Sequence, residues 1–351
     1  SSVAATKQEA SSTMALLQQG RSLVAMLQCS TNSFKAGSVV RRAGVLQQRR
    51  SPCRASSTAA LPEVKRFAVF GAGQMGTGIG IVAARHAELE VFLFDSNPSS
   101  VQRSEAFVKT WAAKEMKKGR LSEDDVKQFQ ERLRFGCLED SAALSAIPSI
   151  DFAVEAVVEN VDVKSSVFAQ VQKAGFPASS VLASNTSSIS ITKLATAIER
   201  PERVIGMHFM NPVPVMPLVE VIRGLQTDDE TTQKTLALCT AMKKQHATSE
   251  DRPGFVSNRV LMPYINEAVM VLQERIATPE DIDKIMKLGT NVPMGPLTLA
   301  DFIGLDTCLS IMQVLHRELG DSKYRPAPLL VNYVQAGWLG RKTKRGFYKY
   351  D

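Results

Sequence analysis

Arg66-Phe-Ala-Val-Phe70, Gly71-Ala-Gly-Gln-Met-Gly76 and Val91-Phe-Leu-Phe94 are the three segments that decide the fold of this 351-residue chain. The two short apolar runs are typical of buried strands. Apolar residues recur at helical spacing after Gly76, which indicates a helix between the strands. A strand, a glycine turn, a helix and a second strand within about 30 residues form a βαβ unit.

The glycine turn has the form that binds the pyrophosphate of a dinucleotide. Gly71 allows a tight turn, Gly73 lets the backbone approach the phosphates, and Gly76 lets the helix pack against the strand. Gln74 and Met75 lie at the start of the helix. The free N–H groups and the positive dipole end of that helix attract phosphate. A glycine turn that binds nothing is the alternative.

Asp95 indicates which dinucleotide is bound. It follows Gly76 by 19 residues and ends the second predicted strand. A carboxylate at this place accepts hydrogen bonds from the ribose hydroxyls of NAD and repels the 2′-phosphate of NADP. Ser96 and Asn97 follow, with no arginine directly after Asp95. The sequence therefore predicts NAD as the cofactor.

The rest of the chain divides into two regions. Further apolar runs predict strands at 150–154, 180–184, 204–208 and 217–222, and residues 99–134 are charged and helical in pattern. After residue 252, only helical segments are predicted, at 255–275, 279–288, 296–317 and 327–337. Thr278 followed by Pro279 is a typical helix start. We therefore expect an α/β fold: a Rossmann-type doubly wound sheet domain at 62–252, followed by an all-α C-terminal domain at 253–351.

The positive charge of the chain is confined to its beginning. No Asp or Glu occurs from Ala10 to Pro62, and the first 62 residues carry the whole formal net charge of +7. The remainder is electrically balanced, which argues against binding to nucleic acid. A basic segment rich in Ser and Ala is typical of an organelle transit peptide. We predict a disordered basic targeting tail at 1–61, with a basic tail of another use as the alternative.

The stretch from Gly206 to Glu220, GMHFMNPVPVMPLVE, holds the best candidates for catalysis. His208 ends a predicted strand, where open α/β sheets bind their ligands. Oxidation of an alcohol needs a base for the hydroxyl proton, and histidine is suited to this near neutral pH. Glu220, on the next strand, can hold the other ring nitrogen. On these two residues alone, a histidine packed for structural reasons is the better interpretation.

Several motifs together resemble those of the L-3-hydroxyacyl-CoA dehydrogenase family, and most of all its bacterial-type 3-hydroxybutyryl-CoA dehydrogenase branch. Beside the two stretches above, they are VEAVVEN at 154, ASNTSSISIT at 183, RPGFVSNR at 252, NVPMGPLTLADFIGLD at 291 and GWLGRKTKRGFYKY at 337. The resemblance covers about residues 64–351. It implies NAD-dependent oxidation of a (S)-3-hydroxyacyl-CoA, with 3-hydroxybutyryl-CoA expected, to the 3-ketoacyl-CoA, and the reverse reaction, in fatty acid β-oxidation or butyrate-type metabolism.

The resemblance also implies roles for single residues. His208 would be the general base and Glu220 its partner, while Ser187 would hydrogen-bond the 3-oxygen of the substrate and Asn258 would position the reacting carbonyl. Lys118 would lie near the phosphates of CoA. The remaining matching positions would line the cofactor; they are Glu159, Lys164, Asn185, Asn211 and Lys342. For Lys118 an ordinary solvated lysine is the alternative, and Asn185 and Ser187 fit equally well as caps of the following helix.

The resemblance implies further properties of the whole protein. The C-terminal helices would form a homodimer, and neither a metal site, nor nucleic acid, nor membrane insertion is expected. The basic tail indicates a mitochondrial location, with a plastid or a peroxisome as alternatives. Two rival functions are a dehydrogenase with a catalytic lysine on the same architecture, and an idle NAD-binding, crystallin-like protein. The preferred acyl chain length and the direction of the reaction stay open.

Overall fold

The computed structural model describes residues 63–140 and 144–351. The predicted targeting tail at 1–61 lies outside the described residues. The chain alternates strands and helices up to residue 250 and continues with helices from residue 257.

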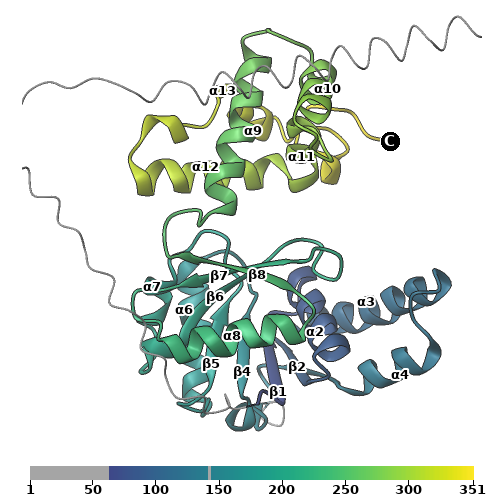
Figure 1. Ribbon diagram of the computed structural model, residues 1–351, viewed down its shortest axis with the longest axis vertical. Helices are drawn as coiled ribbons and strands as arrows, with labels where there is room; N and C mark the ends of the chain where they lie inside the picture. Colours follow the sequence, from purple (N-terminus) through teal and green to yellow (C-terminus); the bar gives the residue numbers. More distant parts are fainter. Residues whose placement is uncertain (1–62, 141–143) are drawn as a thin grey trace, which may run out of the picture. The chain divides into compact units, whose positions relative to one another are not determined.

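One eight-stranded sheet forms the first domain (Figure 1). Its strands are β1 (Arg66–Phe70), β2 (Glu90–Asp95), β3 (Leu133–Cys137), β4 (Phe152–Glu155), β5 (Val181–Ser184), β6 (Val204–Phe209), β7 (Leu218–Arg223) and β8 (Gln245–Glu250). They lie in the order β3-β2-β1-β4-β5-β6-β7-β8, and only the pairing of β6 with β7 is antiparallel. The chain reverses its winding direction between β1 and β4, which is the point where doubly wound sheets bind ligands. The predicted Rossmann-type sheet is confirmed.

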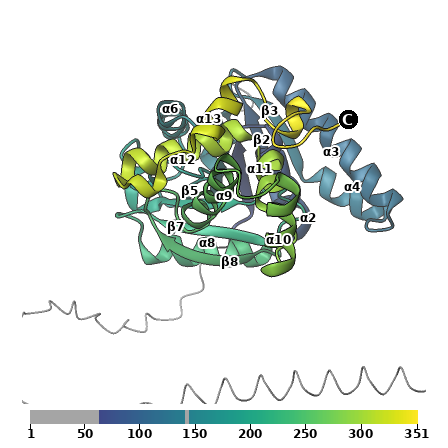
Figure 2. The ribbon, with the colours of Figure 1, turned by 90° about the horizontal axis from the view of Figure 1, so that it is seen from above.

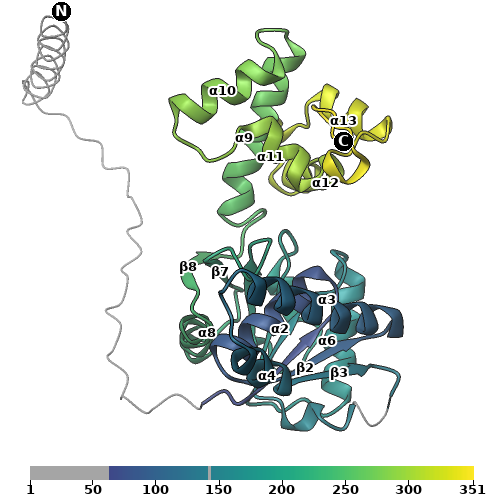
Figure 3. The same cartoon turned by 90° about the vertical axis from the view of Figure 1, so that its right-hand side faces the viewer.

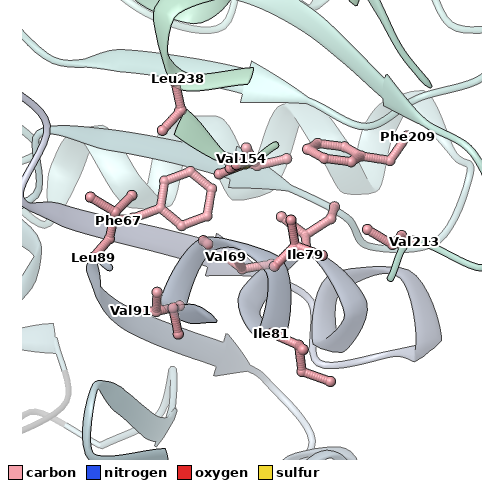
Figure 4. Close-up of a cluster of buried hydrophobic side chains, with 14 of the residues drawn as sticks. Phe67, Val69, Ile79, Ile81, Leu89, Val91, Val154, Phe209, Val213 and Leu238 are labelled. Atoms are coloured by element: carbon pink, nitrogen blue, oxygen red, sulfur yellow. The ribbon is translucent and has the colours of Figure 1, made fainter. Parts of the chain in front are cut away.

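Alternate side chains of the strands point to opposite faces of the sheet, and each face is covered by helices. The helices of this domain are α2 (Gln74–His86), α3 (Pro98–Lys117), α4 (Glu123–Glu131), α6 (Val161–Lys173), α7 (Ile191–Ala195) and α8 (Asp229–Ala241). Phe67 and Val69 of β1 pack with Ile79 of α2 and Leu238 of α8 (Figure 4). Ala68 and Phe70, whose side chains point to the other face of the sheet, belong to a second cluster, which includes side chains of α6 and α7. Helix α8 runs beside β7 and β8 (Figures 1 and 2).

The second domain is all-helical, as predicted. Its helices are α9 (Ser257–Gln273), α10 (Pro279–Gly289), α11 (Pro296–Ile303), α12 (Leu305–Leu319) and α13 (Pro328–Gln335). Helix α9 contacts each of the other four (Figure 3), and Met262, Ile265 and Val269 of α9 are buried among them. The Thr278 side chain caps α10 by accepting a hydrogen bond from the backbone N–H of Asp281.

Three element predictions were wrong. Residues 99–134 are not one helical region, because they contain the break between α3 and α4 and the first residues of β3. Strand β8 was not predicted: its sequence, QHATSE, is polar and almost wholly exposed at the edge of the sheet, so no apolar pattern marks it. The helix predicted at 296–317 is two helices that meet at 97° around Gly304, whose φ of +104° is incompatible with a continuing helix.

Among the described residues, no single helix is long and apolar enough to cross a membrane. Within them, only α11 and α12 taken together have the necessary length and apolar composition, and this pair is sharply bent. Within the same residues, no group of three or more His, Cys, Asp and Glu side chains is placed to hold a metal ion.

Candidate active site

The carboxyl ends of β1, β2, β4 and β5 meet at one edge of the sheet, where the predicted Gly71 and Asp95 lie. Gly71 follows β1, Asp95 ends β2, Glu155 ends β4 and Ser184 ends β5. These four strands are parallel neighbours, so their carboxyl ends lie side by side. The arrangement places the glycine turn next to the segment 156–159 and the segment 185–188 beyond it.

A cavity of about 820 Å³ opens at the point where the winding direction reverses. Its walls include Gly71, Gly73, Gln74 and Met75 of the glycine turn and Asp95 of β2. The opposite wall consists of residues that follow β4, from Ala156 to Val158, and residues of α6. The cavity therefore combines the two features that NAD requires, a helix N-terminus for the pyrophosphate and a carboxylate for the ribose.

The three glycines of the turn differ in the space around them. A Cβ atom on Gly71 would lie 2.6 Å from the carbonyl oxygen of Ala156, and one on Gly76 would meet the carbonyl oxygen of Gly71 at 1.8 Å. Both contacts are shorter than real Cβ contacts, so the fold itself excludes side chains there. A Cβ atom on Gly73 would meet nothing within 4 Å. No protein atom therefore requires a glycine at that position, and the open space fits the close approach of a pyrophosphate.

The Asp95 carboxylate is held in place by the backbone of the same edge. Oδ2 accepts a hydrogen bond of 2.8 Å from the N–H of Ala72, and Oδ1 accepts one of 2.8 Å from the N–H of Asn97. Both donors are neutral, and each carboxylate oxygen keeps a further lone pair. The geometry leaves Asp95 able to accept hydrogen bonds from ribose hydroxyls.

His208 and Glu220 face each other across the antiparallel pair of β6 and β7. They are register partners, which explains how residues twelve apart in the chain meet. His208 Nδ1 lies 3.2 Å from Glu220 Oε2, and both side chains are buried. A carboxylate only accepts hydrogen bonds, so Nδ1 carries the proton and Nε2 keeps its lone pair. This is the tautomer that a general base needs.

Glu220 is surrounded by donors. Its Oε1 accepts hydrogen bonds from the N–H groups of Val256 (2.7 Å) and Ser257 (3.3 Å), and its Oε2 accepts one of 2.7 Å from the Ser257 hydroxyl. Burial alone would raise the pKa of Glu220, but the hydrogen bonds from His208, Ser257 and Val256 outweigh it and hold this pKa below its ordinary value. Glu220 is therefore an anion at neutral pH, as the partner of a protonated imidazole must be.

Ser187 lies in a turn that a single carboxylate organises. Glu159 Oε1 accepts hydrogen bonds from the Ser187 N–H (2.8 Å), the Ser187 hydroxyl (3.2 Å) and the Thr186 hydroxyl (2.6 Å). Asn258 of α9 donates a hydrogen bond of 3.0 Å from its side-chain amide to the backbone carbonyl of Ser187. The two residues predicted to hold the substrate oxygen are thus in direct contact.

The contacts in the turn around Ser187 show whether Asn185 and Ser187 cap the following helix, α7. The cap of α7 is Ser190, whose hydroxyl accepts from the N–H of Lys193, so the alternative in which Asn185 and Ser187 cap this helix is wrong. Asn185 instead accepts a hydrogen bond of 2.9 Å from the N–H of Phe209 and ties β5 to the strand that carries His208.

A buried ion pair that the sequence did not reveal lies beneath this turn. Glu155 and Lys164 are 0% and 1% exposed, and Glu155 Oε1 lies 2.7 Å from Lys164 Nζ. The lysine also contacts Glu159 Oε2 at 3.2 Å. The second oxygen of Glu155 accepts a hydrogen bond of 2.6 Å from Ser184, which in turn accepts from the N–H of Thr186. The role predicted for Lys164 in lining the cofactor stays a prediction; its ammonium group neutralises the carboxylates of Glu155 and Glu159.

The remaining predicted residues have partners other than His208 and Glu220. Asn211 accepts a hydrogen bond of 3.1 Å from Gln74 of the glycine turn, which puts it beside the cofactor cavity. Lys118 is half-exposed at the end of α3 and pairs with Glu115 at 2.9 Å. Lys342 pairs with Asp306 of the helical domain at 2.5 Å. The roles predicted for Lys118 in CoA binding and for Lys342 in cofactor binding stay predictions.

Fold and site together define a class: a Rossmann-type protein that binds a nicotinamide dinucleotide next to a histidine–carboxylate pair. Two family models match this chain, the NAD-binding domain of 3-hydroxyacyl-CoA dehydrogenase over residues 66–252 and the C-terminal domain of the same enzyme over residues 254–350. The chain belongs to the 3-hydroxyacyl-CoA dehydrogenase family, as its motifs indicated.

Individual relatives agree with the family models. The chain is 52% identical to a probable 3-hydroxybutyryl-CoA dehydrogenase of Bacillus subtilis over 289 residues, which are 82% of this chain and 98% of the relative. It is 39% identical to the mitochondrial hydroxyacyl-coenzyme A dehydrogenase of Mus musculus, with 82% of this chain and 91% of the relative covered. The crystal structure of (S)-3-hydroxybutyryl-CoA dehydrogenase from Ralstonia eutropha superposes with a TM-score of 0.78 at 45% identity, covering 82% of this chain and 100% of that one.

Proposed function

We propose that this protein catalyses the NAD-dependent oxidation of (S)-3-hydroxybutyryl-CoA to acetoacetyl-CoA, and the reverse reaction. The observation that carries the proposal is the buried pair of His208 and Glu220, 3.2 Å apart at the same sheet edge as the dinucleotide cavity. Relatives that share 40–52% of their residues with this chain are named as 3-hydroxybutyryl-CoA dehydrogenases. Their names support the short acyl chain.

The chemistry needs one proton acceptor and one hydride acceptor. His208 Nε2 takes the proton of the 3-hydroxyl group, and the Glu220 anion stabilises the imidazolium that results. Ser187 and Asn258 hold the 3-oxygen and the neighbouring carbonyl, so that the reacting atoms stay aligned. NAD supplies the hydride acceptor when it is bound, and Gly71, Gly73, Asp95 and Asn211 are the residues that would hold it.

The test is an absorbance assay with the full chain, acetoacetyl-CoA and either NADH or NADPH. Rapid oxidation of NADH and much slower oxidation of NADPH are expected, because the Asp95 carboxylate repels a 2′-phosphate. Faster turnover with NADPH would contradict the assignment of Asp95. A folded protein that binds NADH and oxidises neither coenzyme would support the idle, crystallin-like alternative.

The open space at Gly73 gives a prediction about the cofactor that does not depend on turnover. Gly73→Ala should fold normally, because its Cβ meets no protein atom within 4 Å, but should weaken NADH binding about 10-fold or more as the methyl group enters the space of the pyrophosphate. Fluorescence titration with NADH measures this. Gly289→Ala is the matched control, since its Cβ also meets nothing within 4 Å and it lies in α10. Equal NADH affinity of the two variants would contradict the assigned phosphate site.

We further propose that the protein is a homodimer formed by its helical domain. Side chains of α9 and α10 that are apolar and exposed support this: Val260 is 68%, Ile285 62% and Leu288 72% exposed. Exposed apolar side chains of this size favour association. Light scattering should give twice the mass of one chain, and a monomer at micromolar concentration would contradict the proposal.

A mitochondrial location is proposed from the basic segment at 1–61, whose only acidic residue is Glu9, and is in line with the name of the mouse relative. A fusion of this segment to a fluorescent protein should reach mitochondria. Delivery to plastids or peroxisomes would overturn the proposal.

A further inference from the structure

Ser257 is the first residue of α9 and touches the candidate catalytic pair. Its hydroxyl donates to Glu220 Oε2 at 2.7 Å and lies 3.5 Å from His208 Nδ1. Oε2 is the same carboxylate oxygen that faces His208. One oxygen of Glu220 thus has two partners, a histidine of the sheet domain and a serine of the helical domain.

Helix α9 and Glu220 depend on each other. The cap residue of α9, Val256, has a side chain that forms no capping hydrogen bond, and the first N–H groups of the helix donate to Glu220 Oε1 instead. Glu220 therefore caps the helix from another domain, and the positive end of the helix dipole stabilises the carboxylate. The Ser257 hydroxyl adds a third donor to this carboxylate.

We infer that Ser257 is a positioning residue for the reaction: its hydroxyl fixes the Glu220 carboxylate in the orientation that holds His208. The role rests on the proposed function, because it is defined by what His208 does. Ser257 does not line the dinucleotide cavity, and it acts through the carboxylate of Glu220.

Loss of the Ser257 hydroxyl should shift the protonation of the His208–Glu220 pair in a definite direction along the pH scale. Without the Ser257 donor, Glu220 becomes a stronger base and binds the imidazolium form of His208 more firmly. The other residues beside Glu220 do not replace this effect: His208 from β6 is the titratable neighbour, β8 places Ala247 opposite, and Val256 contributes only its backbone N–H. Protonation of the pair should therefore begin at higher pH in a variant that lacks the hydroxyl group.

The experiment compares pH profiles of kcat/KM for Ser257→Ala and the parent in both reaction directions. The acidic limb of the oxidation and the basic limb of the reduction should both move to higher pH by about 0.5–1 unit, since one hydrogen bond to a charged group is lost. The KM for NAD should stay unchanged. Ser257→Thr, which keeps the hydroxyl group, should return both limbs towards the parent profile.

A matched control separates positioning from general stability. Ser180→Ala also removes a buried hydroxyl group, whose 2.6 Å hydrogen bond goes to the carbonyl of Ile150 below the site, and should leave both limbs in place. Coincident profiles of Ser257→Ala and the parent would overturn the inference. So would an equal shift in Ser180→Ala.

A second measurement distinguishes failure of this inference from failure of the proposed function. The chain has four histidines, so the imidazole resonances of His208 can be assigned by NMR from their absence in His208→Gln. The titration of His208 should occur at higher pH in Ser257→Ala even if the parent shows no turnover. A titration identical to that of the parent would overturn the role of Ser257, whereas absent turnover with a shifted titration would contradict only the reaction.

Discussion

His208→Gln is expected to lower kcat by about 10²–10⁴-fold, because general acid–base help from one well-placed side chain is worth that much. Glutamine keeps a polar group near Glu220 but has no basic nitrogen. The His208 side chain is 11% exposed and lines no wall of the dinucleotide cavity. The affinity for NADH should therefore change little. Steady-state kinetics with acetoacetyl-CoA, combined with a fluorescence titration of NADH, measures both quantities.

The matched control for this substitution is His246→Gln. His246 is an exposed residue of edge strand β8, on the far side of β7 from His208. It should keep the activity of the parent. If His208→Gln retained more than about a tenth of the parent kcat, another group would be the base, and the histidine packed for structural reasons would be the correct interpretation of this residue.

The sheet domain was predictable from the sequence where the evidence is local. The βαβ unit around Gly71 depends on neighbouring residues: a short apolar run, a glycine turn and a helical spacing. Strands β3 and β8 were not predicted, because they are the two edge strands of the sheet and most of their side chains are exposed or half-exposed. It also joined α11 to α12, since a single Gly304 within an apolar helical pattern is no clear break signal.

The sequence suggested that His208 and Glu220 form a pair, but it did not predict the strand register that brings the two side chains together. Two strands with a proline-rich connection place residues twelve apart in register only if β7 turns back antiparallel to β6. The spacing contains no information on that direction. The motif resemblance supplied the pair, and the register explains why its two members meet.

Ser257 and Glu155 show what the sequence does not contain. Ser257 adjoins Asn258, which was predicted, but its contact with Glu220 spans 37 residues and joins two domains. Glu155 belongs to VEAVVEN, and nothing in the sequence of that motif marks this glutamate as buried. Glu155 can be buried because Lys164, nine residues later on α6, places its ammonium group 2.7 Å from the Glu155 carboxylate.

Lys164→Met is expected to destabilise the protein by about 3–5 kcal/mol, because it leaves Glu155 as a buried charge without a cationic partner. Both side chains are at most 1% exposed, so water cannot replace the ammonium group. The turn that holds Ser187 should loosen as well. Glu155 is linked to this turn by its hydrogen bond with Ser184, and Glu159, which organises the turn, loses the same ammonium group. Thermal and denaturant unfolding measure the loss of stability.

The pH dependence of this loss has a definite sign. Burial raises the pKa of Glu155, and Lys164 opposes the effect, so removal of the lysine raises this pKa further. A carboxyl group with a raised pKa in the folded state binds its proton more firmly there than in the unfolded chain. The folded variant is therefore penalised increasingly as the pH rises above the ordinary pKa of glutamate. Lys164→Met should be closer to the parent in stability at pH 5 than at pH 8.

A double variant tests whether the unpaired charge is the cause. Glu155→Gln/Lys164→Met removes both charges, and it should recover much of the lost stability and abolish the difference between pH 5 and pH 8, because replacing a buried ion pair as a whole costs far less than breaking it. Glu155→Gln also keeps an oxygen that can accept from Ser184. A double variant as unstable as Lys164→Met would show that the packing of the lysine stem, and not its charge, holds α6 against the end of β4.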